Sequence, residues 1–324
     1  MPRASLVLTA ATAVLVLAAP LAGPAAAAPV RDSYLLKPVG PAADLIFPEG
    51  VATDGRQFFV GSTTDGTVYR GTLAGRVATP FLRGGADSRT SLTGLKVDGG
   101  QLLAAGAATG RFFVYDIESR DLVGSYRVQP GPSETAPSFI NDETVTPDGS
   151  TYVTDSIRPF LYRVGPERAT DGVAPLEAFL DFTGTPLQYT AGFNVNGIAA
   201  SADGRNLVLA KSNTADLWRV DVATKEVTKI DLGGASVAGD GLVLDGTTLY
   251  AVERQGEVGQ IVTIELAPDL ASGTVLSRTT DPSFDDPTTA ALARGRLLVV
   301  NSQFGERGGV GTLDPFTVSS IPAP

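Results

Sequence analysis

Apolar residues along this chain come in short runs that alternate with turn signals. The runs are rich in Val, Leu, Ile, Phe and Tyr, and no segment keeps the 3.6-residue period of an amphipathic helix. Glycine (37 residues) and proline (22 residues) are spread through the chain and do not gather in one linker. Frequent turns between short strands produce such a pattern. The sequence therefore predicts an all-β fold.

One strand–turn–strand pattern repeats six times. Each copy has a small or polar entry residue, an apolar strand, an Asp-Gly-like turn, a second apolar strand and a third strand, usually with an aromatic centre. The entry residues are Glu49, Thr93, Asn141, Asn196, Asp240 and Pro287. Their spacing of 44 to 55 residues is close to the roughly 40–50 residues of a four-stranded propeller blade. We therefore predict one domain over residues 29–324, a six-bladed β-propeller of four-stranded antiparallel blades.

Both ends of this region extend beyond the six copies. The segment Asp32–Phe47 precedes the first copy, and its strand-like part, Ser33–Leu36, is expected to pair with the last blade and close the ring. The third strand of the last copy is expected at Val310–Thr312. An irregular β-sandwich is the alternative fold, disfavoured because sandwiches lack a turn repeated at a fixed register.

The first 28 residues have the layout of a secretory signal peptide. Arg3 supplies a positive charge, Leu6–Leu21 is apolar, and Ala25–Ala28 offers small residues for cleavage near Ala28. A membrane anchor is the alternative, but the apolar stretch is short and two prolines interrupt its end. We expect a secreted, extracellular protein without membrane attachment after cleavage.

Composition narrows the chemistry that the chain can perform. The net charge of −10 disfavours nucleic acid and anionic membranes as partners, which leaves a small-molecule ligand. There is no cysteine and no histidine, so disulfides and the common His-dependent and Cys-dependent nucleophiles are excluded. Metal sites built on imidazole or thiolate are excluded as well. Oxygen ligands remain, and they favour Ca²⁺ or Mg²⁺.

The entry residues carry the candidate chemistry. In a propeller, the innermost strand of each blade begins at the pore, so residues far apart in sequence meet at the axis. Four of the six entry residues are oxygen donors: Glu49, Asn141, Asn196 and Asp240. Two carboxylates neutralise Ca²⁺, and amide oxygens with water complete its shell. Each residue alone is more typical of a turn than of a ligand, but four donors in the same register favour a ligand set. A metal site and a set of turns therefore both stay open here.

Four motifs in order give a family resemblance. They are Phe47-Pro48-Glu49-Gly50, Asn141-Asp142 before Thr146-Pro147-Asp148-Gly149, Asn196-Gly197 before Ser201-Ala202-Asp203-Gly204, and Gly239-Asp240-Gly241. The order of these motifs and their positions within the blades resemble the regucalcin/gluconolactonase family and the related phosphotriesterases. The resemblance covers essentially the whole region that follows the predicted signal peptide.

The resemblance implies one catalytic divalent ion in the pore. Calcium is expected first, with Mg²⁺, Mn²⁺ or Zn²⁺ as alternatives. The implied ligands are Glu49, Asn196 and Asp240, with Asn141 as a further ligand or a substrate-orienting amide. Asp240 would also be the catalytic base or nucleophile. The expected function is a secreted, metal-dependent hydrolase of lactones or related esters, in which the ion polarises the carbonyl.

Departures from the family pattern limit the substrate. Sugar-lactone members carry an arginine at the place of Phe139, so a simple sugar lactone is not the expected substrate. The candidate substrate contacts are Phe139, Asn141 and Thr93. Two other functions stay open: a non-catalytic binding or scaffold propeller with a structural Ca²⁺, and a strictosidine-synthase-like propeller with a pore carboxylate facing an amine.

Four further residues have two readings each. Asp155 is a candidate to support Asn141, with a strand-end turn as the alternative. Asp286 is a candidate pore carboxylate or, with Pro287, a turn. Trp218 and Tyr162 occupy the repeated aromatic position of the third strand and are expected to pack between blades, with a ligand cage as the disfavoured alternative.

Overall fold

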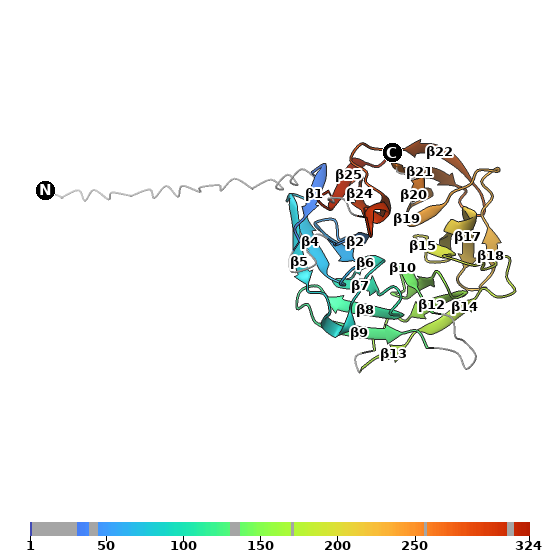
Figure 1. Ribbon diagram of the computed structural model, residues 1–324, viewed down its shortest axis with the longest axis horizontal. Helices are drawn as coiled ribbons and strands as arrows, with labels where there is room; N and C mark the ends of the chain where they lie inside the picture. Colours follow the sequence, from blue (N-terminus) through green and yellow to red (C-terminus); the bar gives the residue numbers. More distant parts are fainter. Residues whose placement is uncertain (2–30, 39–44, 130–136, 170–171, 256–257, 310–313) are drawn as a thin grey trace.

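The computed structural model describes residues 1, 31–38, 45–129, 137–169, 172–255, 258–309 and 314–324. The predicted signal peptide over residues 1–28 and the predicted strand at Val310–Thr312 therefore lie outside the described residues, except for Met1. Within the described ranges, no helix has the length and apolar character needed to span a membrane. The strands form four-stranded units arranged in a ring around one axis (Figure 1).

The first three blades follow the chain in order. Blade 1 consists of β2 (Pro48–Thr53), β3 (Gln57–Ser62), β4 (Val68–Thr72) and β5 (Val77–Leu82). Blade 2 consists of β6 (Leu95–Asp98), β7 (Gln101–Ala105), β8 (Arg111–Asp116) and β9 (Leu122–Arg127), with the short β13 (Ala174–Pro175) added in parallel to β9. Blade 3 consists of β10 (Ile140–Val145), β11 (Thr151–Asp155), β12 (Phe160–Val164) and β14 (Glu177–Asp181).

The last three blades continue the same plan. Blade 4 consists of β15 (Val195–Ala200), β16 (Asn206–Lys211), β17 (Asp216–Asp221) and β18 (Val227–Lys229). Blade 5 consists of β19 (Gly239–Asp245), β20 (Thr248–Gln255), β21 (Val258–Leu266) and β22 (Gly273–Thr279). Blade 6 consists of β23 (Pro287–Ala293), β24 (Arg296–Asn301), β25 (Thr317–Pro322) and β1 (Ser33–Leu36). The predicted all-β propeller is confirmed.

The repeated turn explains why the blades share one register. In every blade, the turn between the first and second strands contains a glycine with positive φ, a region that side chains disfavour. These glycines are Gly55 (79°), Gly99 (51°), Gly149 (80°), Gly204 (70°), Gly246 (62°) and Gly295 (72°). The Asp-Gly-like turn identified in the sequence therefore follows the inner strand in every copy, with its glycine one to four residues after the strand ends.

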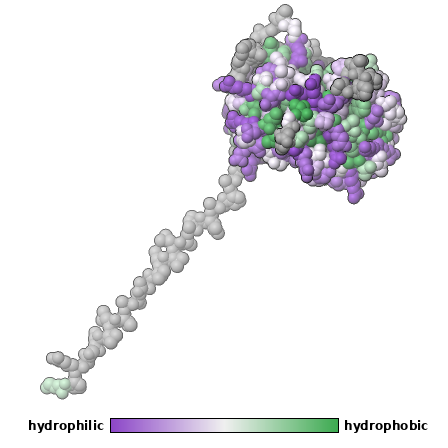
Figure 2. Space-filling view, turned by 90° about the horizontal axis from the view of Figure 1, so that it is seen from below, coloured by the Kyte–Doolittle hydropathy of each residue, from purple (hydrophilic) through white to green (hydrophobic). Residues whose placement is uncertain are grey.

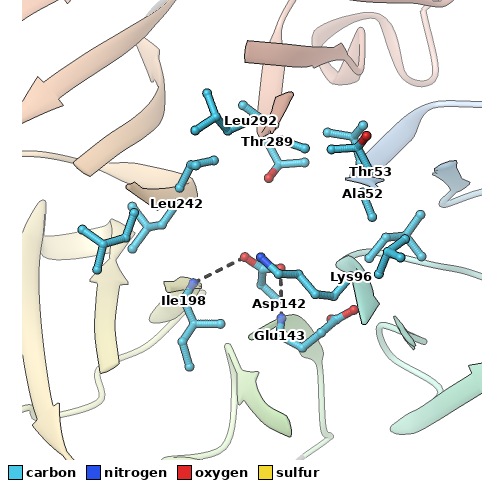
Figure 3. A pocket seen from close by; sticks show the side chains of 16 residues that line it. Ala52, Thr53, Lys96, Asp142, Glu143, Ile198, Leu242, Thr289 and Leu292 are labelled. Atoms are coloured by element: carbon cyan, nitrogen blue, oxygen red, sulfur yellow. Dashed lines mark hydrogen bonds between the residues drawn. The ribbon is translucent and has the colours of Figure 1, made fainter. Parts of the chain in front are cut away.

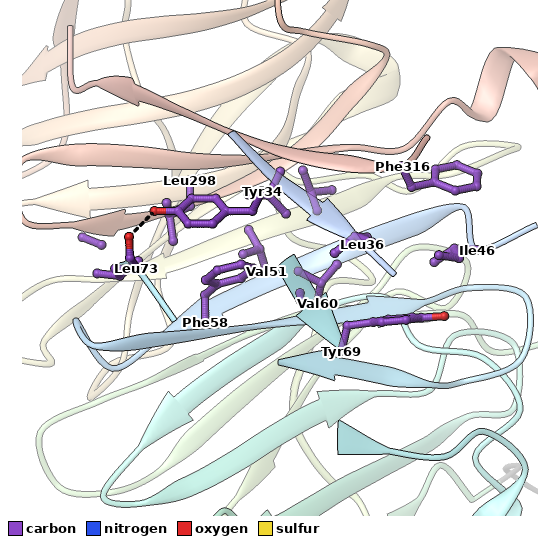
Figure 4. Packing of buried hydrophobic residues seen from close by; sticks show 14 of the residues in the cluster. Tyr34, Leu36, Ile46, Val51, Phe58, Val60, Tyr69, Leu73, Leu298 and Phe316 are labelled. Atoms are coloured by element: carbon purple, nitrogen blue, oxygen red, sulfur yellow. Dashed lines mark hydrogen bonds between the residues drawn. The ribbon is translucent and has the colours of Figure 1, made fainter. Parts of the chain in front are cut away.

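Strand β1 closes the ring, as the sequence predicted. Tyr34 of β1 lies opposite Val318 of β25 in an antiparallel pair, and Leu35 lies opposite Val77 of β5 in a parallel pair. The Tyr34 ring packs 4.7 Å from the Phe58 ring, and its hydroxyl donates to the Leu73 carbonyl at 3.0 Å (Figure 4). The third strand of blade 6 is β25, C-terminal to the predicted position.

Hydrophobic clusters join each blade to the next. One cluster links blades 6 and 1 through residues such as Leu298 and Val60, and five others bridge the remaining neighbours. Trp218 and Tyr162 are buried in two of these clusters, which confirms their packing role. Polar and apolar residues are interspersed on the side of the ring seen in Figure 2.

Adjacent inner strands approach each other so closely at the pore that only glycine fits after several entry residues. A Cβ on Gly50 would lie 2.1 Å from the Thr93 carbonyl oxygen, and one on Gly197 would lie 2.1 Å from the carbonyl oxygen of Asp240. The Gly94 amide uses this proximity to donate to the Asn141 carbonyl at 2.6 Å. The glycine that follows Glu49, Thr93, Asn196 and Asp240 is thus a packing requirement.

We predict that Gly197→Ala lowers the free energy of unfolding by about 1–3 kcal/mol, the usual cost of overpacking. Gly165→Ala is the matched control, since its added Cβ would meet nothing within 4 Å. Urea denaturation of both variants checks the prediction, and equal effects at the two positions would contradict it.

Candidate functional site

The starts of the inner strands surround a cavity of about 380 Å³, which we call the entrance cavity. All six residues singled out in the sequence line it: Glu49, Thr93, Phe139, Asn141, Asn196 and Asp240. They come from β2, β10, β15 and β19 and from the segments that precede β6 and β10. The sixth entry residue, Pro287, is not among the lining residues, so blade 6 supplies no oxygen donor from that position.

A β-bulge at the start of the inner strands aims the donors into the pore. The pairing register of β2 with β3 shifts between Pro48 and Val51, and β19 shifts against β20 between Gly239 and Leu242. Strands β10, β15 and β23 have the same irregularity at the equivalent place. Because a bulge redirects side chains locally, Glu49 and Asp240 turn toward the axis while the rest of each strand stays paired.

Two of the donors carry oxygen atoms that have no partner. Glu49 is 8% exposed and Asn141 is 4% exposed. Glu49 Oε2 and Asn141 Oδ1 are both buried without a hydrogen-bond partner in the described part of the protein. Burial raises the pKa of Glu49 well above its ordinary value, and the negative charges of Asp240, Asp142 and Glu143 add to the shift. Such orphaned oxygens are costly unless a cation or a ligand satisfies them.

Asn196 and Asp240 form the other half of the donor set. Asn196 Nδ2 donates to Asp240 Oδ1 at 2.7 Å. Burial raises the pKa of Asp240 to about 7, although the Arg254 cation and the Asn196 hydrogen bond both favour the ionised form. A carboxyl that titrates near neutral pH suits a general base.

Ser156 orients Asn141, and the sequence did not single out that contact. Asn141 Nδ2 donates to Ser156 Oγ at 2.9 Å, and Ser156 Oγ donates to the Val195 carbonyl at 2.8 Å. This arrangement leaves Asn141 Oδ1 facing the cavity. Asp155 instead accepts from the amides of Phe139 and Arg158, so the strand-end turn is its role and support of Asn141 is not.

Thr93 and Phe139 line the cavity in different ways. The Thr93 hydroxyl donates to the Ile140 carbonyl at 3.1 Å, which ties blade 2 to blade 3 and leaves only its lone pairs for a ligand. The Phe139 ring is held edge-on against the Phe193 ring, with centroids 4.8 Å apart. Both residues thus remain candidate substrate contacts, Phe139 through an apolar surface.

Two arginines at the mouth of the cavity were missed in the sequence. Arg254, on β20, pairs with Asp286 at 2.5 Å, and Asp286 also accepts from the Gly305 amide at 2.8 Å. Asp286 is therefore a partner of Arg254 and is not among the cavity-lining carboxylates. Arg307 lies over the rings of Phe47 and Phe304. Arg307 lies in a connection after β24, away from the repeated strands. Arg254 stands where four other blades carry a serine or a threonine, so it departs from the repeat at that position.

Below the entrance cavity, a second cavity of about 230 Å³ is lined by all six inner strands, and we call it the axial cavity (Figure 3). Asp142 accepts there from the amides of Glu143 and Ile198. Glu143 is 1% exposed and neither of its carboxyl oxygens has a partner in the described residues. Burial raises the pKa of Asp142 to about 6 and that of Glu143 well above its ordinary value, while Lys96 opposes both shifts.

The donor chemistry fits a hard divalent cation. Two carboxylates and two amides line the entrance cavity, and two of their oxygens are orphaned. Within the described residues, no three acidic, histidine or cysteine side chains gather as a ready-made metal cluster. An ion at this site therefore depends on the amide oxygens of Asn141 and Asn196 as much as on the carboxylates.

Comparison with known proteins finds no matching family model and no matching curated sequence. Solved structures do match. A candidate gluconolactonase aligns over 91% of this chain and 93% of its own, at 16% identity and a TM-score of 0.58. Regucalcin from Agrobacterium tumefaciens, described as calcium-binding, aligns over 92% and 96%, at 16% identity and a TM-score of 0.61. The fold is that of regucalcin and gluconolactonase.

This gluconolactonase-like propeller fold is also shared with proteins of other kinds. The major allergen Mala s 1 of Malassezia sympodialis aligns over 90% of this chain and 96% of its own, at 13% identity and a TM-score of 0.64. At such identities the likeness establishes the fold. The chemistry of the pore has to be argued from the residues of this chain.

The buried carboxylates make the stability of the metal-free protein depend on pH. A carboxyl whose pKa is higher in the folded than in the unfolded chain takes up protons on folding, so stability falls as pH rises between the two values. For Asp240 this window runs from 3.8 to about 7. We predict a higher Tm at pH 5 than at pH 8 in EDTA.

The Asp240→Asn variant tests this window at one residue. Its amide oxygen can still accept from Asn196. At pH 8 in EDTA we expect a gain of up to about 4 kcal/mol in the free energy of unfolding, because the window spans about three pKa units at about 1.4 kcal/mol each. Glu226→Gln, at an exposed turn, is the matched control and should change little. Wild-type stability that rises from pH 5 to pH 8 would refute the assignment.

Proposed function

We propose that this protein is a divalent-metal-dependent hydrolase of lactones or related esters. The observation that carries the proposal is the pair of orphaned oxygens, Glu49 Oε2 and Asn141 Oδ1, buried in the same cavity as Asp240. Calcium is the preferred ion because every available donor is a hard oxygen. The small-molecule substrate would enter the entrance cavity, whose volume lies at the lower end of the range for ligand pockets.

Glu49, Asn141, Asn196 and Asp240 would hold the ion. When bound, a divalent cation would offset the buried negative charge and polarise an ester carbonyl. Ser156 fixes the Asn141 amide so that its oxygen is turned toward the cavity. The hydrogen bond from Asn196 fixes one oxygen of Asp240 and leaves the other free to act on substrate or water.

Asp240 would act as the general base. A water in the cavity gives a proton to the Asp240 carboxylate while its oxygen bonds to the carbonyl carbon, and the ester C–O bond then breaks to release an alcohol and an acid. The proton held by Asp240 can pass to the leaving alkoxide, which balances the step. Arg254 stabilises the ionised form of Asp240 from the mouth of the cavity.

We predict Ca²⁺-dependent hydrolysis of at least one member of a panel of lactones and aryl esters. Asp240→Ala should lower kcat/KM by about 10²–10⁴-fold, the range expected when a general base is lost. The assay compares EDTA-treated protein with and without added Ca²⁺, and Glu226→Gln serves as the control. Absence of turnover above the Asp240→Ala background across the panel would refute the hydrolase.

Calorimetry separates catalysis from a structural ion. A ligand that binds only the folded state raises its stability according to its concentration relative to Kd, so Ca²⁺ should raise the Tm in either case. A large Ca²⁺-dependent rise without activity on any substrate would instead favour the non-catalytic binding or scaffold propeller.

Export is a further part of the proposal. It is supported by the charged, apolar and small-residue order of the first 28 residues. We predict that the mature protein, recovered from outside the cells that make it, begins near residue 29. N-terminal sequencing checks this, and a secreted chain that retains Arg3 would contradict it.

A further inference from the structure

One wall of the entrance cavity is aromatic. Phe139 immediately precedes β10, and Phe193 lies just before β15, so the pair stands on blades 3 and 4. Their rings meet at 86° with centroids 4.8 Å apart. Phe193 is nevertheless 48% exposed. The exposed surface of the Phe193 ring is not buried by the propeller itself. It is therefore available for contact with a ligand.

The opposite wall is cationic. Phe304 belongs to the short helix η3 (Phe304–Glu306), which follows β24. The guanidinium groups of Arg254 and Arg307 both lie over its ring, 5.9 Å and 4.9 Å from the centroid. In Figure 1 a short red helical turn stands near the centre of the ring. Arg254 is already paired with Asp286. Arg307 has no ion pair within the described residues and donates only to the Thr63 hydroxyl.

Aromatic contacts leave the charge of Arg307 available. Its guanidinium lies 4.8 Å from the Phe47 centroid and 4.9 Å from the Phe304 centroid. These faces hold the group at the cavity mouth but do not neutralise it, and a guanidinium fork matches a carboxylate in geometry. The candidate donors Glu49, Asn141, Asn196 and Asp240 lie in the same cavity as both walls.

We propose that the substrates are esters or lactones with an apolar or aromatic body that also carry a carboxylate. The body packs on Phe139 and Phe193, the carboxylate pairs with Arg307, and the ester carbonyl lies over the four donors. A polyhydroxylated lactone fits poorly, because Phe139 and Phe193 can form no hydrogen bonds with its hydroxyls through their side chains. This inference rests on the proposed function for its reacting group.

Matched esters test the two walls separately. The probes are mono-4-nitrophenyl succinate, 4-nitrophenyl butyrate as its neutral counterpart, and glucono-δ-lactone as the polyol. We expect wild-type kcat/KM to favour the succinate over the butyrate by about tenfold, as for a charge-assisted contact. Arg307→Gln should abolish that preference, because it lowers kcat/KM for the succinate by about tenfold more than for the butyrate.

Phe193→Ala should lower kcat/KM for both aryl esters by roughly fivefold, through lost aromatic contact. The matched controls are Arg205→Gln and Leu276→Ala, because both side chains are exposed and absent from the cavity lining. A better rate on glucono-δ-lactone than on either ester overturns the inference, and so does an Arg307→Gln variant that keeps the succinate preference.

A binding measurement keeps the inference distinct from the proposed function. If the wild type hydrolyses no ester, the proposed hydrolase function is refuted. Titration calorimetry with 4-phenylbutyrate then tests separately whether the cavity binds an aromatic carboxylate. Binding that weakens about tenfold in Arg307→Gln supports the inference even so. Absence of binding, or equal affinity in both proteins, overturns it.

Discussion

The close approach of neighbouring inner strands at the pore is the constraint on which the rest of the structure depends. A Cβ on Gly197 would lie 2.1 Å from the Asp240 carbonyl oxygen. The backbones of β15 and β19 are therefore too close at this point for any side chain to fit between them. That contact sets the diameter of the ring, and the bulges then turn the entry side chains inward. Donors from four blades can reach a common point only because the glycines that follow three of them allow the strands this close.

The same geometry concentrates negative charge. Glu49 and Glu143 are buried and Asp142 and Asp240 are partly buried around one axis. The pKa values of all four are raised by desolvation and, for three of them, by one another. Lys96 is the cation that faces the axial cavity, and Arg254 acts from the opposite end. Ring closure thus holds together groups that repel, at the expense of stability. Such an arrangement is typical of a site that binds a cation.

The sequence was sufficient for the fold and for the entry residues, because both repeat. Gly55 and its counterparts mark the turn in every copy, and each entry residue lies six or eight residues before that glycine, as Glu49 and Asn196 show. Phe193 and Arg307 could not be found that way, since both lie in connections that differ from blade to blade. Ser156 and Arg254 do stand at an equivalent position, just after the residue that pairs with the start of the bulged inner strand, where Thr63, Ser212 and Ser302 also lie. Three of the bulges contain the glycine that follows the entry residue, namely Gly50, Gly197 and Gly241, but the other two bulges have no glycine there. Asp142 and Glu143 were visible as consecutive acids in an apolar strand, but their burial depends on neighbours from other blades.

The pairing of β1 with β25 has a consequence for how the molecule is made. Tyr34 pairs with Val318, although the two residues are separated by nearly the whole sequence. Blade 6 therefore cannot be completed until the last strand has been synthesised. Contacts of such long range form late and slow the folding of a domain. Until then β24 presents an unpaired edge, which invites association with other chains. A chain that ends before β25 would keep that edge permanently, whereas a chain that lacks β1 would leave the outer edge of β25 unpaired.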